Sequence, residues 1–300
     1  MFSRRHPYLY FLLVFSTIVG ASAVGLTLLV VLGIKSPDFE FGENGEAVGV
    51  VEINGLIADA GDTIRMIKKF RDNKSVKAIV LRIDSPGGGV GPSQEIFREV
   101  RKTVKQKKVV ASLGSVAASG GLYIAVGADG IVANPGTVTG SIGVIIGYAN
   151  FQQLLEKIGL VPVVVKSGPY KDIGSPTRKM SEDEKKILQD FVDSVHRQFI
   201  SAIAEGRNLQ LAKVEAIADG RIFSGEVAMQ LGLVDRIGNL EDAIEWAGRM
   251  GGIKGKITAL YPREKRFSFL KYFVDSFLQV AKEAIRPHLA VQYYYPAYAE

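Results

Sequence analysis

The chain has 300 residues, of which 47% are apolar and 23% are charged, so it can bury the core of one sizeable globular domain with appended segments. The 37 Lys and Arg residues exceed the 31 Asp and Glu residues by six, but this excess is spread along predicted helices, which argues against a nucleic-acid partner. The lack of cysteine excludes disulfides, thiolate metal sites and a cysteine nucleophile.

The N-terminal region predicts a membrane anchor. Residues 8–34 carry no charge and are long enough to cross a bilayer as a tilted helix. Two arginines precede this stretch and acidic residues follow it, so the positive-inside rule predicts a cytoplasmic N-terminus at 1–7 and places the remaining chain on the extracytoplasmic side of the cytoplasmic membrane. The small residues at 21–23 resemble a signal-peptide cleavage site, but the apolar run continues beyond them to Leu32. We therefore expect an uncleaved single-pass anchor.

A linker at 35–46, which mixes proline, glycine and acids, precedes the predicted domain at 47–257. Within the domain, short apolar runs alternate with amphipathic segments. The predicted strands are 48–53, 76–83, 109–113, 130–133, 144–146 and 161–165. The predicted helices are 63–71, 92–105, 151–158, 211–218, 226–231 and 240–250. This alternation predicts the α/β class with a largely parallel sheet.

A long helix should begin at the capping box Ser181-Glu182-Asp183-Glu184. Apolar residues recur at helical spacing as far as Phe199, which predicts that one face of this helix is buried. His196 lies at the border of that face, and we interpret it as a packed or solvated helix residue. The other two histidines, His6 and His288, also lie outside any segment that looks like a catalytic loop.

The last 43 residues, 258–300, are predicted to form a C-terminal tail that contains an amphipathic helix at about 267–286. After Pro287 the sequence becomes A-V-Q-Y-Y-Y-P-A-Y-A-E, which is too apolar for an ordinary solvated tail. It could dock on the domain, on a second copy of the chain or on a membrane surface.

Ser119 is the candidate nucleophile. It stands in the run G-S-V-A-A-S-G-G-L-Y-I-A, at the predicted start of a helix and just before Gly120 and Gly121. Glycines at these positions let a substrate carbonyl approach closely, and amides at a helix start are electropositive. The alternative is a small-residue helix contact, because serine among glycine and alanine is common in packed helices.

A second glycine-rich loop follows the predicted strand 76–83 and has the sequence Asp84-Ser85-Pro86-Gly87-Gly88-Gly89. Its backbone amides could converge on the oxyanion that forms during acyl transfer. The alternatives are a flexible turn or a phosphate loop, but the Gly-Lys-Ser/Thr of a nucleotide site is missing.

A serine hydrolase without a suitable histidine needs a lysine base. Lysine has an ordinary pKa of about 10.4, so the amine must be desolvated before it can accept a proton near neutral pH. The loop at 166–172 offers Lys166 and Lys171, and Asp172 would keep Lys171 charged if the two paired. Residue chemistry and spacing do not separate these two lysines.

Four motifs in order, behind one N-terminal anchor, resemble the short bacterial signal peptide peptidases of the SppA type, in peptidase family S49. They are D-S-P-G-G-G-V, G-S-V-A-A-S-G-G-L-Y-I-A, T-G-S-I-G-V and S-G-P-Y-K-D-I-G-S-P. The resemblance covers roughly residues 47–257 and implies a ClpP/crotonase-like spiral of β-β-α units, assembled as a homo-oligomeric ring.

The resemblance also implies roles for individual residues. It makes Ser119 the nucleophile, Lys171 the general base and Ser141 the group that orients the lysine amine, while Gly88 and Gly120 supply the oxyanion amides. It implies that the serine and the lysine of one site come from neighbouring protomers, and that no metal or cofactor takes part. Leu122 stands where the family commonly has an aromatic residue, which could change a wall of the substrate pocket.

The expected function is a membrane-anchored serine endopeptidase with a Ser-Lys dyad that degrades released signal peptides and similar unfolded apolar peptides. One alternative is a related protease that trims membrane proteins together with a stomatin-like scaffold. Another is a crotonase-type acyl-CoA enzyme, although an extracytoplasmic domain argues against it because coenzyme A is cytoplasmic. The non-enzymatic alternative is a membrane-tethered assembly protein in which Ser119 only packs.

Overall fold

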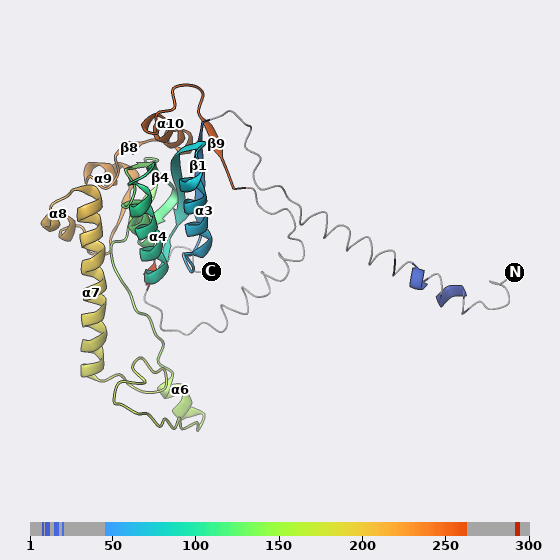
Figure 1. The fold of residues 1–300 in the computed structure, drawn as a ribbon. Coiled ribbons are helices and arrows are strands. Elements are labelled where there is room, and N and C mark those ends of the chain that lie inside the picture. Colours follow the sequence, from blue (N-terminus) through green and yellow to red (C-terminus); the bar gives the residue numbers. More distant parts are fainter. Residues whose placement is uncertain are drawn as a thin grey trace. The chain divides into compact units, whose positions relative to one another are not determined.

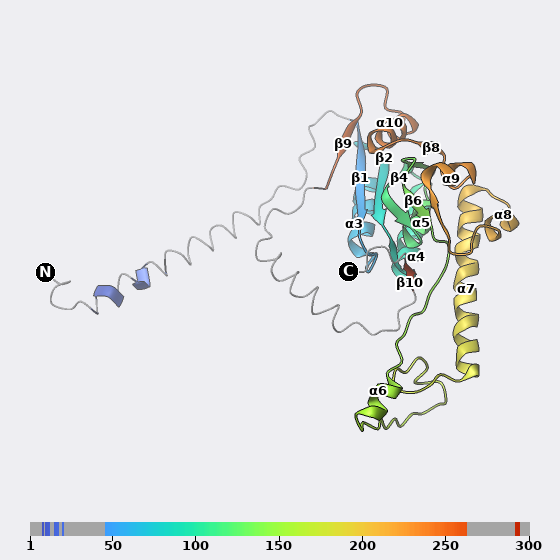
Figure 2. The ribbon, with the colours of Figure 1, turned by 180° about the vertical axis from the view of Figure 1, so that it is seen from behind.

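The computed structural model describes residues 46–262 and 292–294, together with helical residues at 8, 10–12, 15–17 and 20 (Figures 1 and 2). Most of the predicted anchor at 8–34, the linker up to residue 45 and the predicted helix at 267–286 lie outside the described residues. Over the described positions, we find no helix with the length and apolarity that a membrane crossing requires.

A mixed, mostly parallel sheet forms the centre of the domain. Its strands are β1 (Ala47–Asn54), β2 (Val76–Ser85), β4 (Lys108–Ala118), β5 (Gly130–Ala133), β6 (Val138–Gly140), β7 (Ile222–Ser224), β8 (Arg236–Ile237) and β9 (Thr258–Leu260). The order β7-β6-β4-β2-β1-β9 forms the main path, while β5 pairs with β4 and β8. The first half of β4 pairs with β5 and its last residues pair with β6, so the end of β4 lies beside the end of β6.

Helices cover both faces of this sheet (Figures 1 and 2). On one face, α10 (Leu240–Met250) packs Ala243, Ile244 and Ala247 against valines of the parallel strands. On the other face lies α3 (Gly61–Asp72), whose buried Phe70 ring occupies the space beside Gly49 of β1: a Cβ at Gly49 would approach that ring to 2.6 Å. Alternate residues of β1 therefore face opposite layers, as the strand period requires.

The longest of the remaining elements are α7 (Glu182–Arg207), with 26 residues, and α4 (Val90–Thr103), with 14. The others are β3 (Gly87–Gly89), α5 (Gly120–Ala125), α6 (Gln152–Lys157), α8 (Leu211–Glu215), α9 (Gly225–Gln230) and β10 (Gln292–Tyr294). The predicted capping box of α7 is confirmed: the Glu184 amide donates to Ser181 Oγ at 3.2 Å, and the Ser181 amide donates to Glu184 Oε2 at 2.9 Å. Further along α7, the buried Phe199 packs against Tyr123 of α5 with ring centroids 5.0 Å apart.

Two predicted strands are wrong. Residues 144–146 contain only an isolated bridge residue, and 161–165 form no strand. Both lie in the α6-bearing segment, which projects away from the sheet in Figures 1 and 2. The β-branched run at 161–165 is largely exposed, with Val165 97% exposed, because no neighbouring strand pairs with it within this chain. Strands β3 and β6 to β9 were not predicted, since two or three residues are too few to show a period.

The ion pairs at the start of α7 predict a pH dependence of stability. The hydrogen bonds from Arg178, and then the Ser181 amide, lower the pKa of Glu184 from 4.5 to about 2. A carboxyl group whose pKa is depressed by folding stabilises the protein above its unfolded pKa and loses that contribution as it becomes protonated. We therefore expect stability to fall as the pH decreases from about 4.5 to about 2.

Glu184→Gln should weaken this pH dependence, because the amide does not titrate. The measurement is the free energy of unfolding by urea at several pH values in that window. A matched control is Glu182→Gln, an exposed carboxylate two residues away. An identical pH slope in Glu184→Gln and the unmodified chain would contradict the prediction.

Candidate active site

Ser119 occupies the sharp junction between β4 and α5. Its backbone has φ 52° and ψ −115°, a region that residues with a side chain rarely adopt, at a cost of about 1–3 kcal/mol. Two hydrogen bonds hold this conformation: the Ser119 amide donates to Gly140 O, and the Tyr123 amide donates to Ser119 O, both at 2.9 Å. The hydroxyl is buried and has no hydrogen-bond partner among the described residues. A strained strand-to-helix turn of this kind presents a nucleophile at the end of a sheet.

Ser141 lies next to this junction. Its neighbour Gly140 pairs with Ala118 in the β4–β6 ladder, so the residues that follow the two strands, Ser119 and Ser141, emerge side by side. Ser141 also has a positive φ, 50°, and its amide donates to Arg221 O at 2.8 Å. The fold thus brings together two serines that are 22 positions apart in the sequence.

Hydrogen bonds connect the loop Asp84 to Gly89 to strand β4 and to Gly55, the residue after β1. Asp84 Oδ1 accepts the Val116 amide of β4 at 3.1 Å. Ser85 Oγ donates to Gly55 O at 2.6 Å and accepts the Gly87 amide at 3.1 Å. The loop is therefore held rigidly against the strand that leads to Ser119.

Gly88 and Gly120 lie close together. A Cβ at Gly120 would lie 2.6 Å from Ser93 Oγ and 3.3 Å from the Gly88 nitrogen, and a Cβ at Gly88 would lie 2.2 Å from Ile57 O. A side chain at Gly88 would therefore collide with the backbone, and one at Gly120 would collide with Ser93. The Gly120 amide also begins a helix, where the first N–H groups have no partner within the helix. The Gly88 loop thus lies against the start of the helix that follows Ser119.

The edge of β3 pairs with the chain's own C-terminal tail. Ile57 takes one edge of β3, since its amide donates to Gly87 O at 2.9 Å and its carbonyl accepts the Gly89 amide at 2.8 Å. Backbone groups alternate between the two edges of an extended strand, so the Gly88 N–H faces the opposite edge. There β10 pairs antiparallel with β3, with Tyr293 opposite Gly88, and it also contacts α5. The sequence left open whether this tail docks on the domain, on a second copy of the chain or on a membrane surface. The structure pairs residues 292–294 with the domain, and this position beside the glycine loop was not predicted.

The two candidate lysines differ in their partners. Lys166 Nζ lies 2.6 Å from Asp172 Oδ1 and is an ion-paired surface group. Lys171 is exposed, and the described residues offer it no ion pair; Asp172 turns to Lys166 and Arg178 instead. The Asp172–Lys171 pair that the sequence left open is therefore not formed.

Within one chain, Lys171 and Ser119 are kept apart by α7. Asp172 is joined through Arg178 to Glu184 at the start of this helix, whereas Phe199 contacts α5, which begins right after Ser119. Residues 184 and 199 are fifteen positions apart, which is about 22 Å along a helix. The structure brings together Ser119, Ser141, Gly88 and Gly120 but leaves Lys171 away from them.

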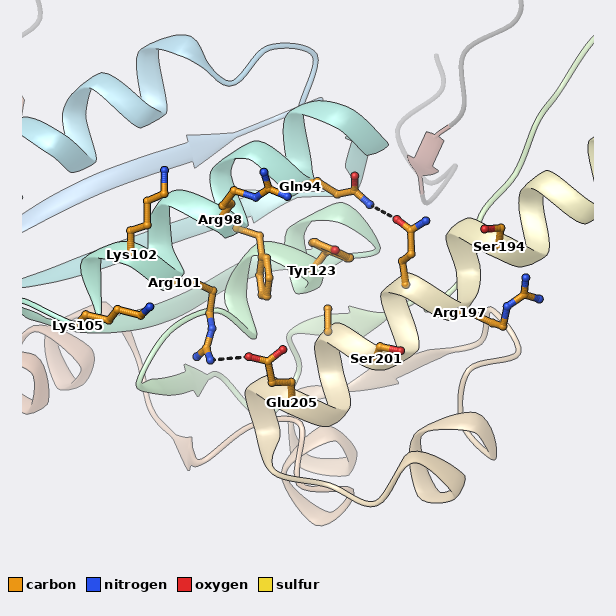
Figure 3. A pocket seen from close by; sticks show the side chains of 13 residues that line it. Gln94, Arg98, Arg101, Lys102, Lys105, Tyr123, Ser194, Arg197, Ser201 and Glu205 are labelled. Carbon is orange, nitrogen blue, oxygen red and sulfur yellow. Dashed lines mark hydrogen bonds and ion pairs between the residues drawn. The ribbon is translucent and has the colours of Figure 1, made fainter.

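A separate cavity of about 780 Å³ lies between α4 and α7 (Figure 3). Its walls are bridged by the Gln94–Gln198 and Arg101–Glu205 hydrogen bonds, both 2.9 Å long. Tyr123 lines it, and burial raises the pKa of that phenol. Ser119 does not line this cavity, so the candidate active site is not the hollow between these helices.

Comparison with known proteins identifies the family. The model for peptidase family S49 matches residues 101–254, and the Clp protease model matches residues 58–137. A protein of Enterococcus faecium named "Putative signal peptide peptidase SppA" is 40% identical over 226 residues, which cover 71% of this chain and 66% of that protein. Protease 4 of Salmonella typhi is 35% identical over 222 residues, which cover 71% of this chain and 36% of that protein.

Another relative is a "Putative protease" of Synechocystis, 48% identical over 205 residues that cover 68% of this chain and 74% of that protein. These matches favour peptide hydrolysis over acyl-CoA chemistry and over a purely structural role. The buried Ser119 hydroxyl lies at a strained strand-to-helix turn, the kind of position that nucleophilic serines occupy. The chain belongs to peptidase family S49 and is a serine protease with a Clp protease-like α/β fold.

Proposed function

We propose that this protein is a membrane-anchored serine endopeptidase with a Ser119–Lys171 dyad, which degrades released signal peptides and similar unfolded apolar peptides. The catalytic domain lies on the extracytoplasmic side of the cytoplasmic membrane. Copies of the chain assemble as a homo-oligomeric ring, each following the ClpP/crotonase-like spiral of β-β-α units.

The observation that carries this proposal is the geometry around Ser119. A strained serine stands beside Gly120 and the Gly88 loop that lies against it, with a second serine next to it. The Gly88 and Gly120 amides are the proposed oxyanion donors. Acyl transfer requires a nucleophile and two donors for the oxyanion, and this arrangement supplies both from rigid backbone. Ser141 is the hydroxyl that orients the incoming lysine amine.

The base comes from a second copy. One chain holds the Lys171 turn and α5 about 22 Å apart along α7, a distance that a lysine side chain cannot span. The α6-bearing segment and the start of α7 also expose an unusual amount of apolar surface, which favours a protein interface. The exposed apolar side chains there are Ile145, Tyr148, Phe151, Leu154, Ile158, Leu160, Val161, Val163, Val164, Val165, Tyr170, Ile187 and Phe191.

In the proposed reaction, Ser119 Oγ attacks the peptide carbonyl carbon while its proton passes to the neutral Lys171 amine of the neighbouring copy. The Gly88 and Gly120 amides donate to the oxyanion. The lysine returns the proton to the departing amine, and the C–N bond breaks to leave an acyl-enzyme. Water, deprotonated by the same amine, then hydrolyses the ester.

The substrate binds as an added strand. The open edge of β3 accepts a three-residue strand from the tail, so it can accept an extended peptide in the same way. Main-chain pairing requires an unfolded substrate, which released signal peptides satisfy. The predicted anchor would keep the enzyme close to the membrane in which such peptides are released.

Ser119→Ala should lower kcat by about 10⁴-fold or more, because the nucleophile is lost. Lys171→Ala should lower it by about 10²–10⁴-fold, because the general base is lost. Cleavage of a fluorogenic apolar peptide by the detergent-solubilised oligomer measures both. Lys213→Ala, an exposed lysine of α8, is the matched control and should retain the unmodified rate. Full turnover in Lys171→Ala would rule out the proposed base.

The shared site predicts complementation between two inactive variants. When Ser119→Ala and Lys171→Ala chains are co-expressed in one oligomer, some interfaces combine an intact serine from one copy with an intact lysine from the next. Random mixing should restore up to about a quarter of the unmodified rate, since one pairing in four is intact. Mixed oligomers that remain as inactive as their parents would show that serine and lysine act within one chain.

Deletion of residues 287–300 should lower KM for added peptide several-fold and leave kcat unchanged. The tethered strand β10 competes for the edge of β3 at high effective concentration, and the deletion removes this competitor. Deletion of residues 297–300 alone keeps the paired residues and serves as the control. An unchanged KM after the longer deletion would contradict the assignment of this edge to substrate.

A further inference from the structure

Arg178 lies between two carboxylates from different parts of the chain. Its Nε and Nη2 each donate to one oxygen of Asp172 at 2.8 Å, and Nη1 donates to Glu184 Oε2 at 2.8 Å. Nη2 also donates to Glu184 Oε1. The planar guanidinium therefore forms a two-pronged contact with each carboxylate, the strongest geometry for such a pair.

These three side chains, Asp172, Arg178 and Glu184, form a clamp, and Glu184 fixes one side of it to α7. Its side chain is buried, and it also accepts the Ser181 amide as part of the capping box. The other side, Asp172, belongs to the turn that carries Lys171. Arg178 thus connects this turn to the first turn of a 26-residue helix.

In the clamp, both carboxylate oxygens of Asp172 accept hydrogen bonds from cations other than Lys171. One oxygen accepts from Arg178 Nε, and the other accepts from Arg178 Nη2 and from Lys166 at 2.6 Å. These bonds hold the pKa of the Asp172 carboxyl far below its ordinary range. Two cations and two carboxylates balance in the cluster, so it adds no net charge beside Lys171.

Backbone hydrogen bonds fix the turn itself. The Lys171 amide donates to Gly168 O at 3.2 Å, and the Ser175 amide donates to Asp172 O at 3.0 Å. The charged or titratable groups around the turn are Lys166, Tyr170, Asp172, Arg178 and Lys179 of the segment itself and Glu184 of α7. Asp172 is the carboxylate nearest in sequence to Lys171, so its engagement by other cations decides whether Lys171 has an anionic neighbour.

We propose that Arg178 is a positioning residue for Lys171: it fixes the turn on α7 and holds the Asp172 carboxylate away from the lysine amine. This inference rests on the proposed function, in which Lys171 is the general base. A base must be neutral before it accepts the serine proton, and a carboxylate within 4–6 Å would favour its charged form. Asp172 can therefore anchor the turn through Arg178 without pairing with the Lys171 amine.

Arg178→Gln tests the proposal through the pH profile of kcat/KM for peptide cleavage by the full-length oligomer. Asp172 Oδ2, which among the described residues only Arg178 Nε binds, should then pair with Lys171, so the alkaline-rising limb of the profile should move up by about one pH unit. The plateau at high pH should also fall several-fold, because the turn is held less firmly. Arg65→Gln, which removes an exposed Arg–Asp pair from α3, is the control and should leave limb and plateau unchanged.

The double variant Arg178→Gln/Asp172→Asn separates positioning from a general loss of structure. Without the carboxylate, the limb should return to its unmodified position while the lowered plateau remains. Asp172→Asn alone should not move the limb upward. A limb that stays high in the double variant would overturn the proposal.

Three outcomes distinguish the inference from the function beneath it. Full turnover in Lys171→Ala contradicts the proposed base itself. An inactive Lys171→Ala combined with an unmodified pH profile in Arg178→Gln contradicts only the role of Arg178. If Arg178→Gln does not assemble, Arg178→Lys decides: a smaller shift in the same direction supports the proposal, and an unmodified limb and plateau overturn it.

Discussion

The catalytic proposal depends on one constraint: the serine hydroxyl needs a neutral amine beside it, and a single chain holds the two apart. The length of α7 imposes this separation. Near one end of the helix, Phe199 packs on Tyr123 of α5, immediately after Ser119; at the other end, Glu184 binds the arginine that holds the Lys171 turn. Under the proposed mechanism each chain carries two half-sites, and a complete site forms when the lysine end of one copy meets the serine end of another. The apolar surface exposed on the lysine half agrees with this arrangement.

The two half-sites are built differently because they have different tasks. The serine half is a backbone construction: a strained residue, two glycine amides and a glycine strand, all tied to the central sheet by hydrogen bonds. Strain at Ser119 persists because β4, β6 and α5 fix the residues on both sides. The lysine half has little core of its own and is held by ion pairs instead. Rigidity is thus concentrated where the oxyanion forms, and the mobile proton carrier is delivered by a segment that a partner must bury.

The sequence predicted the long strands of the sheet and the amphipathic helices, because both have clear periods. It also predicted the start of α7 from the capping box at Ser181. It failed at 161–165, where a run of valines looks like a buried strand. Such a run indicates that its apolar side chains should be buried, but it does not indicate whether they are buried within the chain or against another one. The glycine and serine motifs predicted a set of residues, Ser119, Ser141, Gly88 and Gly120, that the structure places close together. Arg178 could not be found this way, since its role depends on two carboxylates that lie six residues away on either side and meet only in the fold.

The ion pairs distinguish two lysines that spacing in the sequence did not separate. Lys166 and Lys171 share one loop, and either could pair with Asp172. In the structure Lys166 takes that carboxylate together with Arg178, which leaves Lys171 as the lysine without an anionic partner among the residues described. A lysine that is already bound to a carboxylate gains more from staying charged, so it resists conversion to a base when an interface buries it. In the proposed mechanism the ion pair of Lys166 therefore argues for Lys171 as the base.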